Sequence, residues 1–192
     1  MFDPFRIYLE NKAKITSEQF AKLAERLTYR QAKHGEVLIK PGEPCTFGMF
    51  VMSGCLRSYT VDRGKEHILQ FAPENWWIGD NYGIIRPDEP ARFSIDAVED
   101  SKIALFDHTF MDSMIKMAPS AAEMKLNLEQ NAFRALQLRI VQLLSATAEE
   151  RYTFFISKYP QLATRLPQRM IASYLGMAPQ SLSRVRSHYI GK

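Results

Sequence analysis

The change of sequence pattern near residue 108 constrains the fold of this chain more than any other feature. Between residues 35 and 107, short runs rich in Val, Ile, Phe and Tyr are separated by Pro-Gly, Ser-Gly and Arg-Gly turns. From Pro119 to Pro160 the chain has no glycine and no internal proline. The pattern predicts an α+β fold, in which an antiparallel, jelly-roll-like β-roll is followed by helices.

We also expect a helix before the strands. Residues 5–30 carry apolar side chains at helical spacing, among them Phe20 and Leu23. The sequence "TSEQ" offers Thr16 or Ser17 as an N-cap. The pattern predicts one short leading helix.

The helical region contains an apolar stripe of the kind that joins two helices. Leu138, Val141 and Leu144 make the same helix apolar on a second side. We therefore predict that one face meets the β-roll and another meets a second copy of the chain, while a helix packed only on its own β-domain is the alternative. The predicted dimer interface comprises Leu126, Phe133, Leu136, Ile140 and Leu143.

The end of the chain differs from the rest in charge. The 192 residues carry a formal net charge of +4, yet no Asp or Glu follows Glu150. Seven basic residues lie after Glu150, which leaves 18 basic and 21 acidic residues within residues 1–150. A basic, periodic and apolar segment of this kind is typical of a folded module that meets a polyanion.

The stretch "IASYLGMAPQSLSRVR", residues 171–186, predicts a helix, a turn and a second helix. Gly176 suits the tight turn, and Pro179 suits the start of the second helix, where its missing N–H costs nothing. An ordinary pair of packed helices is the alternative. The residues expected to hold the two helices together are Ile171, Ala172, Leu175, Met177, Leu182 and Val185.

The outward side chains of the second helix have the chemistry for reading double-stranded DNA. Gln bridges N6 and N7 of adenine, Arg bridges O6 and N7 of guanine, and Ser reaches base or phosphate oxygens. We expect this helix to enter the major groove, with further arginines neutralising phosphates. The predicted DNA-binding residues are Gln180, Ser181, Ser183, Arg184, Arg186 and Arg169.

In the order of these elements the chain resembles the Crp/Fnr family of bacterial transcription regulators. The motifs that carry the resemblance are "GEVLIKPGEPCTFGMFVMSGCLRSYTVDRGKEHILQFAPENWWIGD", "SIDAVEDSKIALFD" and "RMIASYLGMAPQSLSRVR". The resemblance implies an effector-binding β-roll, a dimerisation helix and a helix-turn-helix that reads a palindromic promoter site, with RNA polymerase as a further partner. The corresponding domains are residues 1–117, 118–147 and 148–192.

The expected effector site departs from the family's cyclic-nucleotide pattern. The resemblance places Gly79 and Asp80 at the ribose-binding Gly-Glu pair, Ala91 at the phosphate-binding arginine and Arg92 at the hydroxyl residue beside it. One residue of slip on a strand turns a side chain to the opposite face. A buried phosphate without its bidentate arginine loses much of its binding energy, so we do not expect cAMP to bind in the usual way. The candidate residues for an unidentified small-molecule effector are Gly79, Asp80 and Arg92, and the insertion "NYGIIRPDEP" offers a different pocket wall.

No metal, haem or iron–sulfur cofactor is expected. Cys45 and Cys55 are too few for a cluster or a four-thiolate site, and no two of the four histidines have a metal-binding spacing. The same histidine pattern argues against an iron-dependent enzyme of the cupin type. No Ser or Cys lies in a nucleophile-elbow context, so we predict that the chain is not an enzyme.

No apolar run approaches the roughly 20 residues of a membrane-spanning helix, so we predict a cytoplasmic protein without a membrane partner. The connection "YPQLATRLPQRM" is too short for the β-hairpin wing of many relatives, and the sequence ends at Lys192. We therefore expect few backbone contacts from a wing. One alternative function stays open, which is a ligand-binding regulatory module whose basic C-terminal helices dock a protein partner.

Overall fold

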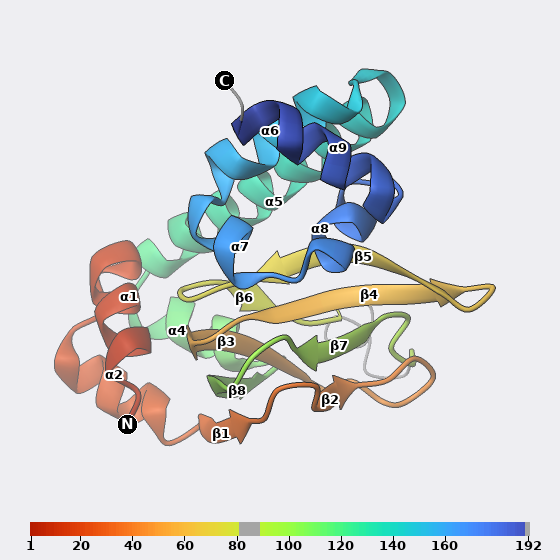
Figure 1. The fold of residues 1–192 in the computed structure, drawn as a ribbon. Helices are drawn as coiled ribbons and strands as arrows, with labels where there is room; N and C mark the ends of the chain where they lie inside the picture. The colour runs from red at the N-terminus through yellow and green to blue at the C-terminus, as the bar shows by residue number, and fades with distance from the viewer. Residues whose placement is uncertain (81–88, 191–192) are drawn as a thin grey trace. The chain divides into compact units, whose positions relative to one another are not determined.

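The computed structural model describes residues 1–80 and 89–190, and it contains two four-stranded antiparallel sheets (Figure 1). The strand orders are β1-β8-β3-β6 and β2-β7-β4-β5, and the described strands form no closed barrel. The predicted α+β fold with an antiparallel β-roll is confirmed. The strands are β1 (Thr28–Ala32), β2 (Val37–Ile39), β3 (Phe47–Ser53), β4 (Leu56–Asp62), β5 (Lys65–Ala72), β6 (Trp77–Ile78), β7 (Ser94–Ala97) and β8 (Ser101–Asp107).

Helices lie before the first strand and after the last strand in the sequence. No described helix is both long enough and apolar enough to cross a membrane. The described helices are α1 (Asp3–Ala13), α2 (Ser17–Ala24), α4 (Phe110–Met117), α5 (Ser120–Ser145), α6 (Ala148–Lys158), α7 (Pro160–Arg165), α8 (Gln168–Tyr174) and α9 (Pro179–Ile190).

The prediction of a single leading helix over residues 5–30 is wrong. Helix α1 ends at Ala13 and is followed by Lys14, whose φ of 55° is left-handed, and α2 begins after Thr16. The Thr16 hydroxyl accepts the Gln19 backbone N–H at 3.2 Å, and the Gln19 side-chain oxygen accepts the Thr16 backbone N–H at 2.9 Å. Thr16 is therefore the N-cap of a capping box. The last residues of the predicted helix belong to β1, where pairing with β8 outweighs local helical spacing.

A second capping box separates the long helix from the helices that follow it. Helix α5 has 26 residues and ends at Ser145. The Glu150 N–H donates to the Thr147 hydroxyl, and the Glu150 carboxylate accepts the Thr147 N–H at 2.7 Å. The hydrogen bonds from Thr147 hold the pKa of Glu150 below its usual value. The chain therefore changes direction between α5 and α6 without a glycine or a proline.

Two apolar clusters stabilise the β-roll. Side chains of α1, α2 and α4 pack on Phe50 of β3 and Ala104 of β8. Trp77 belongs to this cluster, with its ring 5.2 Å from the Phe5 ring and 5.4 Å from the Phe50 ring. The second cluster joins the two sheets and contains Leu56, Ile95, Ala97 and Ile103.

The chain divides into two compact units. The first unit consists of Met1–Thr60 and Gln70–Gln130, which hold most of the β-roll and the helices packed on it. The second unit consists of Val61–Leu69 and Asn131–Lys192. It thus combines the end of the β4–β5 hairpin with the second half of α5 and the C-terminal helices.

Candidate nucleic-acid interface

Helices α8 and α9 form a helix-turn-helix around Gly176. The Gly176 backbone is left-handed, with φ of 65°. Its N–H donates to the Ser173 carbonyl at 3.1 Å, and the Met177 N–H donates to the Ala172 carbonyl at 3.0 Å, which satisfies carbonyls at the end of α8. A Cβ at position 176 would lie 2.8 Å from Cδ2 of Leu143. The predicted role of Gly176 in the turn agrees with this geometry.

Apolar contacts hold the two helices together, as the sequence predicts. Met177, in the turn, is partly buried, whereas the other five predicted packing residues are buried. Ala172 and Leu182 have no exposed surface, which is consistent with close packing of the two helices. The five buried residues are Ile171, Ala172, Leu175, Leu182 and Val185.

The outward face of α9 carries polar side chains without intramolecular partners. Gln180, Ser181, Ser183 and Arg184 are exposed, and Arg186 is partly buried. None of these side chains makes a hydrogen bond or an ion pair with the rest of the described chain. Such groups are free to reach base edges or phosphates, the two classes of contact that DNA recognition needs.

A basic residue lies at the start of α8, and an acidic residue lies near the end of α9. Arg169, at the start of α8, is exposed. Glu149 of α6 lies 3.6 Å from Nδ1 of His188, close to the C-terminal end of α9 and away from Gln180. The short helix α7 occupies the connection before α8, and the described residues there contain no hairpin wing.

The predicted dimer positions of α5 lie on the surface of the chain. Leu126, Phe133, Leu136, Ile140 and Leu143 are between 44% and 61% exposed. Leu138, Val141 and Leu144 are exposed as well, and Leu144 reaches 82%. Several exposed apolar side chains on one helix are typical of an interaction surface.

Of the predicted effector residues, Asp80 contacts the backbone of Arg92. Asp80 is 1% exposed, and its Oδ2 accepts the backbone N–H groups of Arg92 at 2.6 Å and Phe93 at 2.9 Å. The Arg92 guanidinium instead lies 3.3 Å from the Glu89 carboxylate and is largely exposed. Gly79 is partly buried. The assignment of these residues to an effector pocket stays a prediction, and residues 81–88 of the insertion "NYGIIRPDEP" lie outside the described residues.

The β-roll contains a buried ion pair whose residues are not among those predicted from the sequence. Arg57 of β4 and Asp96 of β7 face each other in register, and each is under one tenth exposed. Arg57 Nε and Nη2 each donate to one Asp96 carboxylate oxygen at 2.8 Å, a bidentate pairing. The guanidinium also lies 4.3 Å from the centre of the Tyr59 ring. Only the strand register brings these residues together, so no local sequence signal predicted the pair.

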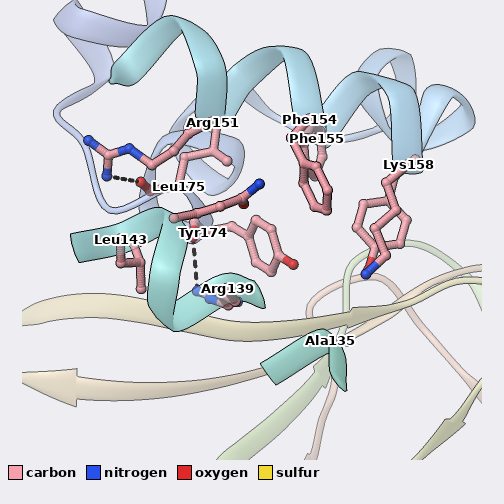
Figure 2. Close-up of a pocket in the computed structure, with 11 residues that line it drawn as sticks. Ala135, Arg139, Leu143, Arg151, Phe154, Phe155, Lys158, Tyr174 and Leu175 are labelled. Carbon is pink, nitrogen blue, oxygen red and sulfur yellow. Dashed lines mark hydrogen bonds between the residues drawn. The ribbon is translucent and has the colours of Figure 1, made fainter. Parts of the chain in front are cut away.

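A small cavity lies among α5, α6 and the end of α8 (Figure 2). Its volume of about 20 Å³ holds about one water molecule and is too small for a nucleotide. Burial lowers the pKa of Arg139 and of Lys158, and raises the pKa of Tyr159. Arg139 and Lys158 nevertheless have no carboxylate partner among the described residues.

The described residues hold no group of three His, Cys, Asp or Glu side chains that is arranged to bind a metal ion. Both cysteines, Cys45 and Cys55, are buried, and they are not joined in a disulfide. The fold is of the class in which a β-roll precedes a long helix and a helix-turn-helix.

Comparison with known proteins agrees with this class. Residues 29–117 match the family model of the cyclic nucleotide-binding domain. The transcriptional activator protein Anr of Pseudomonas aeruginosa is 25% identical over 172 residues, which are 83% of this chain and 69% of the relative. The electron transport regulator A of Shewanella oneidensis is 26% identical over 170 residues, which are 81% of this chain and 66% of the relative. The chain thus spans about two thirds of the length of these relatives.

Solved structures share the fold. CooA of Carboxydothermus hydrogenoformans superimposes with a TM-score of 0.76 at 18% identity, over 92% of this chain and 81% of that one. FixK2 of Bradyrhizobium japonicum gives 0.71 at 22% identity, over 86% of each chain. These similarities support the resemblance of the chain to the Crp/Fnr family of transcription regulators. Its relatives are regulators and not enzymes, in agreement with the prediction that this chain has no enzymatic activity.

Proposed function

We propose that the chain is a homodimeric transcription regulator that reads a palindromic promoter site with α9. The observation that carries the proposal is the exposed polar face of α9, where Gln180, Ser181, Ser183 and Arg184 have no partner within the described chain. A helix-turn-helix presents such a face to the major groove. The sequence after Glu150 contains no acidic residue, which supports a polyanionic partner. A regulator of promoters acts in the cytoplasm, and RNA polymerase is a further proposed partner.

The proposed dimer uses the exposed apolar face of α5, which comprises Leu126, Phe133, Leu136, Ile140 and Leu143. An interface between two parallel copies of one helix is self-complementary, as twofold symmetry requires. A twofold dimer has two copies of α9. These can bind successive major grooves when the two half-sites lie about 34 Å apart. The chain then acts as three parts, with residues 1–117 for the effector, 118–147 for dimerisation and 148–192 for DNA.

The proposed effector site lies beside Gly79, Asp80 and Arg92, and two observations support an effector other than cAMP. Ala91 stands where the family resemblance expects the phosphate-binding arginine, and the Asp80 carboxylate already accepts two backbone N–H groups. Isothermal titration of the purified protein with cAMP tests this part of the proposal. We expect no binding heat, whereas saturable binding at micromolar concentration would overturn it.

Selection of duplexes from a random double-stranded DNA pool, followed by sequencing, tests the proposed function. We expect a palindrome with half-sites about one helical turn apart. The matched control is Arg184→Ala, which should shift the base preference at one position of each half-site. Weak, sequence-independent retention that disappears at physiological salt would contradict the proposal and favour a module that docks a protein partner.

A further inference from the structure

Arg139 contacts two other segments of the second unit. It lies on α5 next to the predicted dimer residue Ile140, but its guanidinium is partly buried rather than part of the exposed apolar face. It donates hydrogen bonds to the carbonyls of Ile68 at 2.7 Å and of Tyr174 at 2.9 Å, and also to the carbonyl of Leu69. It lies 3.9 Å from the centre of the Tyr174 ring (Figure 2). Arg139 therefore joins α5 to the β4–β5 hairpin and to the end of α8.

Ser173 makes a second connection between the hairpin and the helix-turn-helix. Its hydroxyl accepts the Ile68 N–H at 3.1 Å and donates to the Glu66 carbonyl at 2.8 Å. Both backbone groups lie on β5, in the part that belongs to the second unit. The hairpin is thus bound to α8 by Ser173 and to α5 by Arg139.

Arg151 contacts the turn of the helix-turn-helix, and we call Arg139, Ser173 and Arg151 together the clamp. It donates from α6 to the Leu175 carbonyl at 2.7 Å, next to the Tyr174 carbonyl that Arg139 holds (Figure 2). Carbonyls at a helix C-terminus lack partners within the helix, and arginine supplies several donors in a fixed planar arrangement. The turn between α8 and α9 is therefore held by two cations from two different helices. Because α9 begins at Pro179, directly after this turn, the clamp constrains the direction of α9.

We propose that Arg139 is the positioning residue that fixes the reading helix α9 relative to the dimerisation helix α5. The inference rests on the proposed function. In a twofold dimer, the direction of α9 relative to α5 sets the separation of the two reading helices, and hence the spacing of half-sites that the dimer accepts. The hairpin strands continue into Leu56–Thr60 and Gln70–Ala72 of the first unit. A movement of these strands would reach α9 through the carbonyls that Arg139 binds.

The test compares wild type, Arg139→Ala, Arg139→Lys and the control Arg134→Ala, which removes an exposed arginine from the same helix. Each variant is titrated against duplexes that carry two half-sites at stepwise spacings, and against a duplex with one half-site. We expect Arg139→Ala to bind the single half-site like wild type. Its preference for the best spacing should fall about tenfold, because bivalent binding depends on geometry. Arg139→Lys should retain part of the wild-type spacing preference, and Arg134→Ala should retain all of it.

Two results of the titrations would overturn the inference. One is an unchanged spacing preference in Arg139→Ala. The other is an equal loss of affinity for the single half-site and for every spacing, which a merely structural role of Arg139 predicts.

Amide hydrogen exchange gives a readout that does not depend on DNA. In Arg139→Ala, residues 66–69 and 173–178 should exchange faster than in wild type, while Arg134→Ala should leave both segments unchanged. Unchanged exchange in Arg139→Ala would overturn the clamp itself. If the exchange result holds but wild type selects no palindrome, the proposed function fails and the positioning role in DNA reading fails with it, whereas the clamp stands.

Discussion

The interior of the β-roll and the outward face of α9 use similar polar side chains in opposite ways. In the β-roll, the Arg57 guanidinium is paired with Asp96, and the Asp80 carboxylate accepts two backbone N–H groups. On α9, Gln180 and Arg184 are exposed and have no partner among the described residues. Polar groups that the chain itself satisfies stabilise the fold, whereas exposed groups without partners are available to another molecule. Substitutions in the β-roll should therefore change the free energy of unfolding, whereas substitutions on α9 should change DNA binding.

The largest expected effect is on folding, from Arg57→Ala. Removing one partner leaves Asp96 as an uncompensated buried charge, which typically costs about 3–5 kcal/mol of the free energy of unfolding. Urea denaturation followed by circular dichroism measures the loss. The control is Lys33→Ala, since Lys33 and Asp100 also lie 2.8 Å apart but are largely exposed, so little change is expected. Similar losses for both variants would mean that burial of the ion pair does not decide its effect on stability.

The next effect is on assembly, from Ile140→Asp. A charge within the proposed dimer interface should weaken the dimer by about 2 kcal/mol or more, a rise of roughly 30-fold in the dissociation constant. Sedimentation equilibrium over a range of concentrations measures it. Leu138→Asp is the matched control, because Leu138 is also exposed but lies on the opposite side of α5. Equal dimer constants for the two variants would show that this face is not the interface.

A smaller effect is expected on DNA recognition, from Arg184→Ala. Loss of a contact to a base edge should cost about 1–3 kcal/mol of binding to the selected site and relax the preference at one position. The free energy of unfolding should change by less than about 0.5 kcal/mol, because the side chain is exposed and has no partner in the described chain. Fluorescence anisotropy on matched and mismatched duplexes measures the first quantity. A large loss of stability without a change in base preference would place Arg184 in the fold instead.

The smallest effect is expected from Arg169→Ala. A phosphate contact carries no sequence information, so affinity should fall by a similar factor on every duplex. The slope of log affinity against log salt should decrease by about one. Titrations at several salt concentrations check this, with Arg184→Ala alongside. A change in base preference in Arg169→Ala would exchange the roles of the two arginines.

Local patterns predicted the parts of the structure that depend on neighbouring residues. The turn at Gly176, the burial of Ile171 and Leu182, and the cap at Thr16 all follow from residues within about a dozen positions of each other. The single helix over residues 5–30 was wrong because apolar spacing alone did not locate the left-handed residue Lys14 or the strand that pairs with β8.

The rest depends on contacts between distant residues. Arg57 and Asp96 are 39 positions apart, and only the pairing of β4 with β7 places them opposite each other. Arg139 binds carbonyls 35 and 71 positions away, and a backbone carbonyl leaves no mark in the sequence. The backbone contacts of Asp80 likewise depend on the path of the chain between Asp80 and Arg92. The signal for Arg139 was an arginine within an apolar helical stretch, which needs a partner when it is buried.

The ratio of specific to non-specific affinity at physiological salt shows whether the exposed face of α9 reads base sequence. Anisotropy titrations would compare the selected palindrome with a duplex of the same composition in scrambled order. We expect wild type to bind the palindrome at least about 1,000-fold more tightly than the scrambled duplex, and Arg184→Ala to lose much of this ratio. A ratio near one for wild type would mean that α9 does not read base sequence.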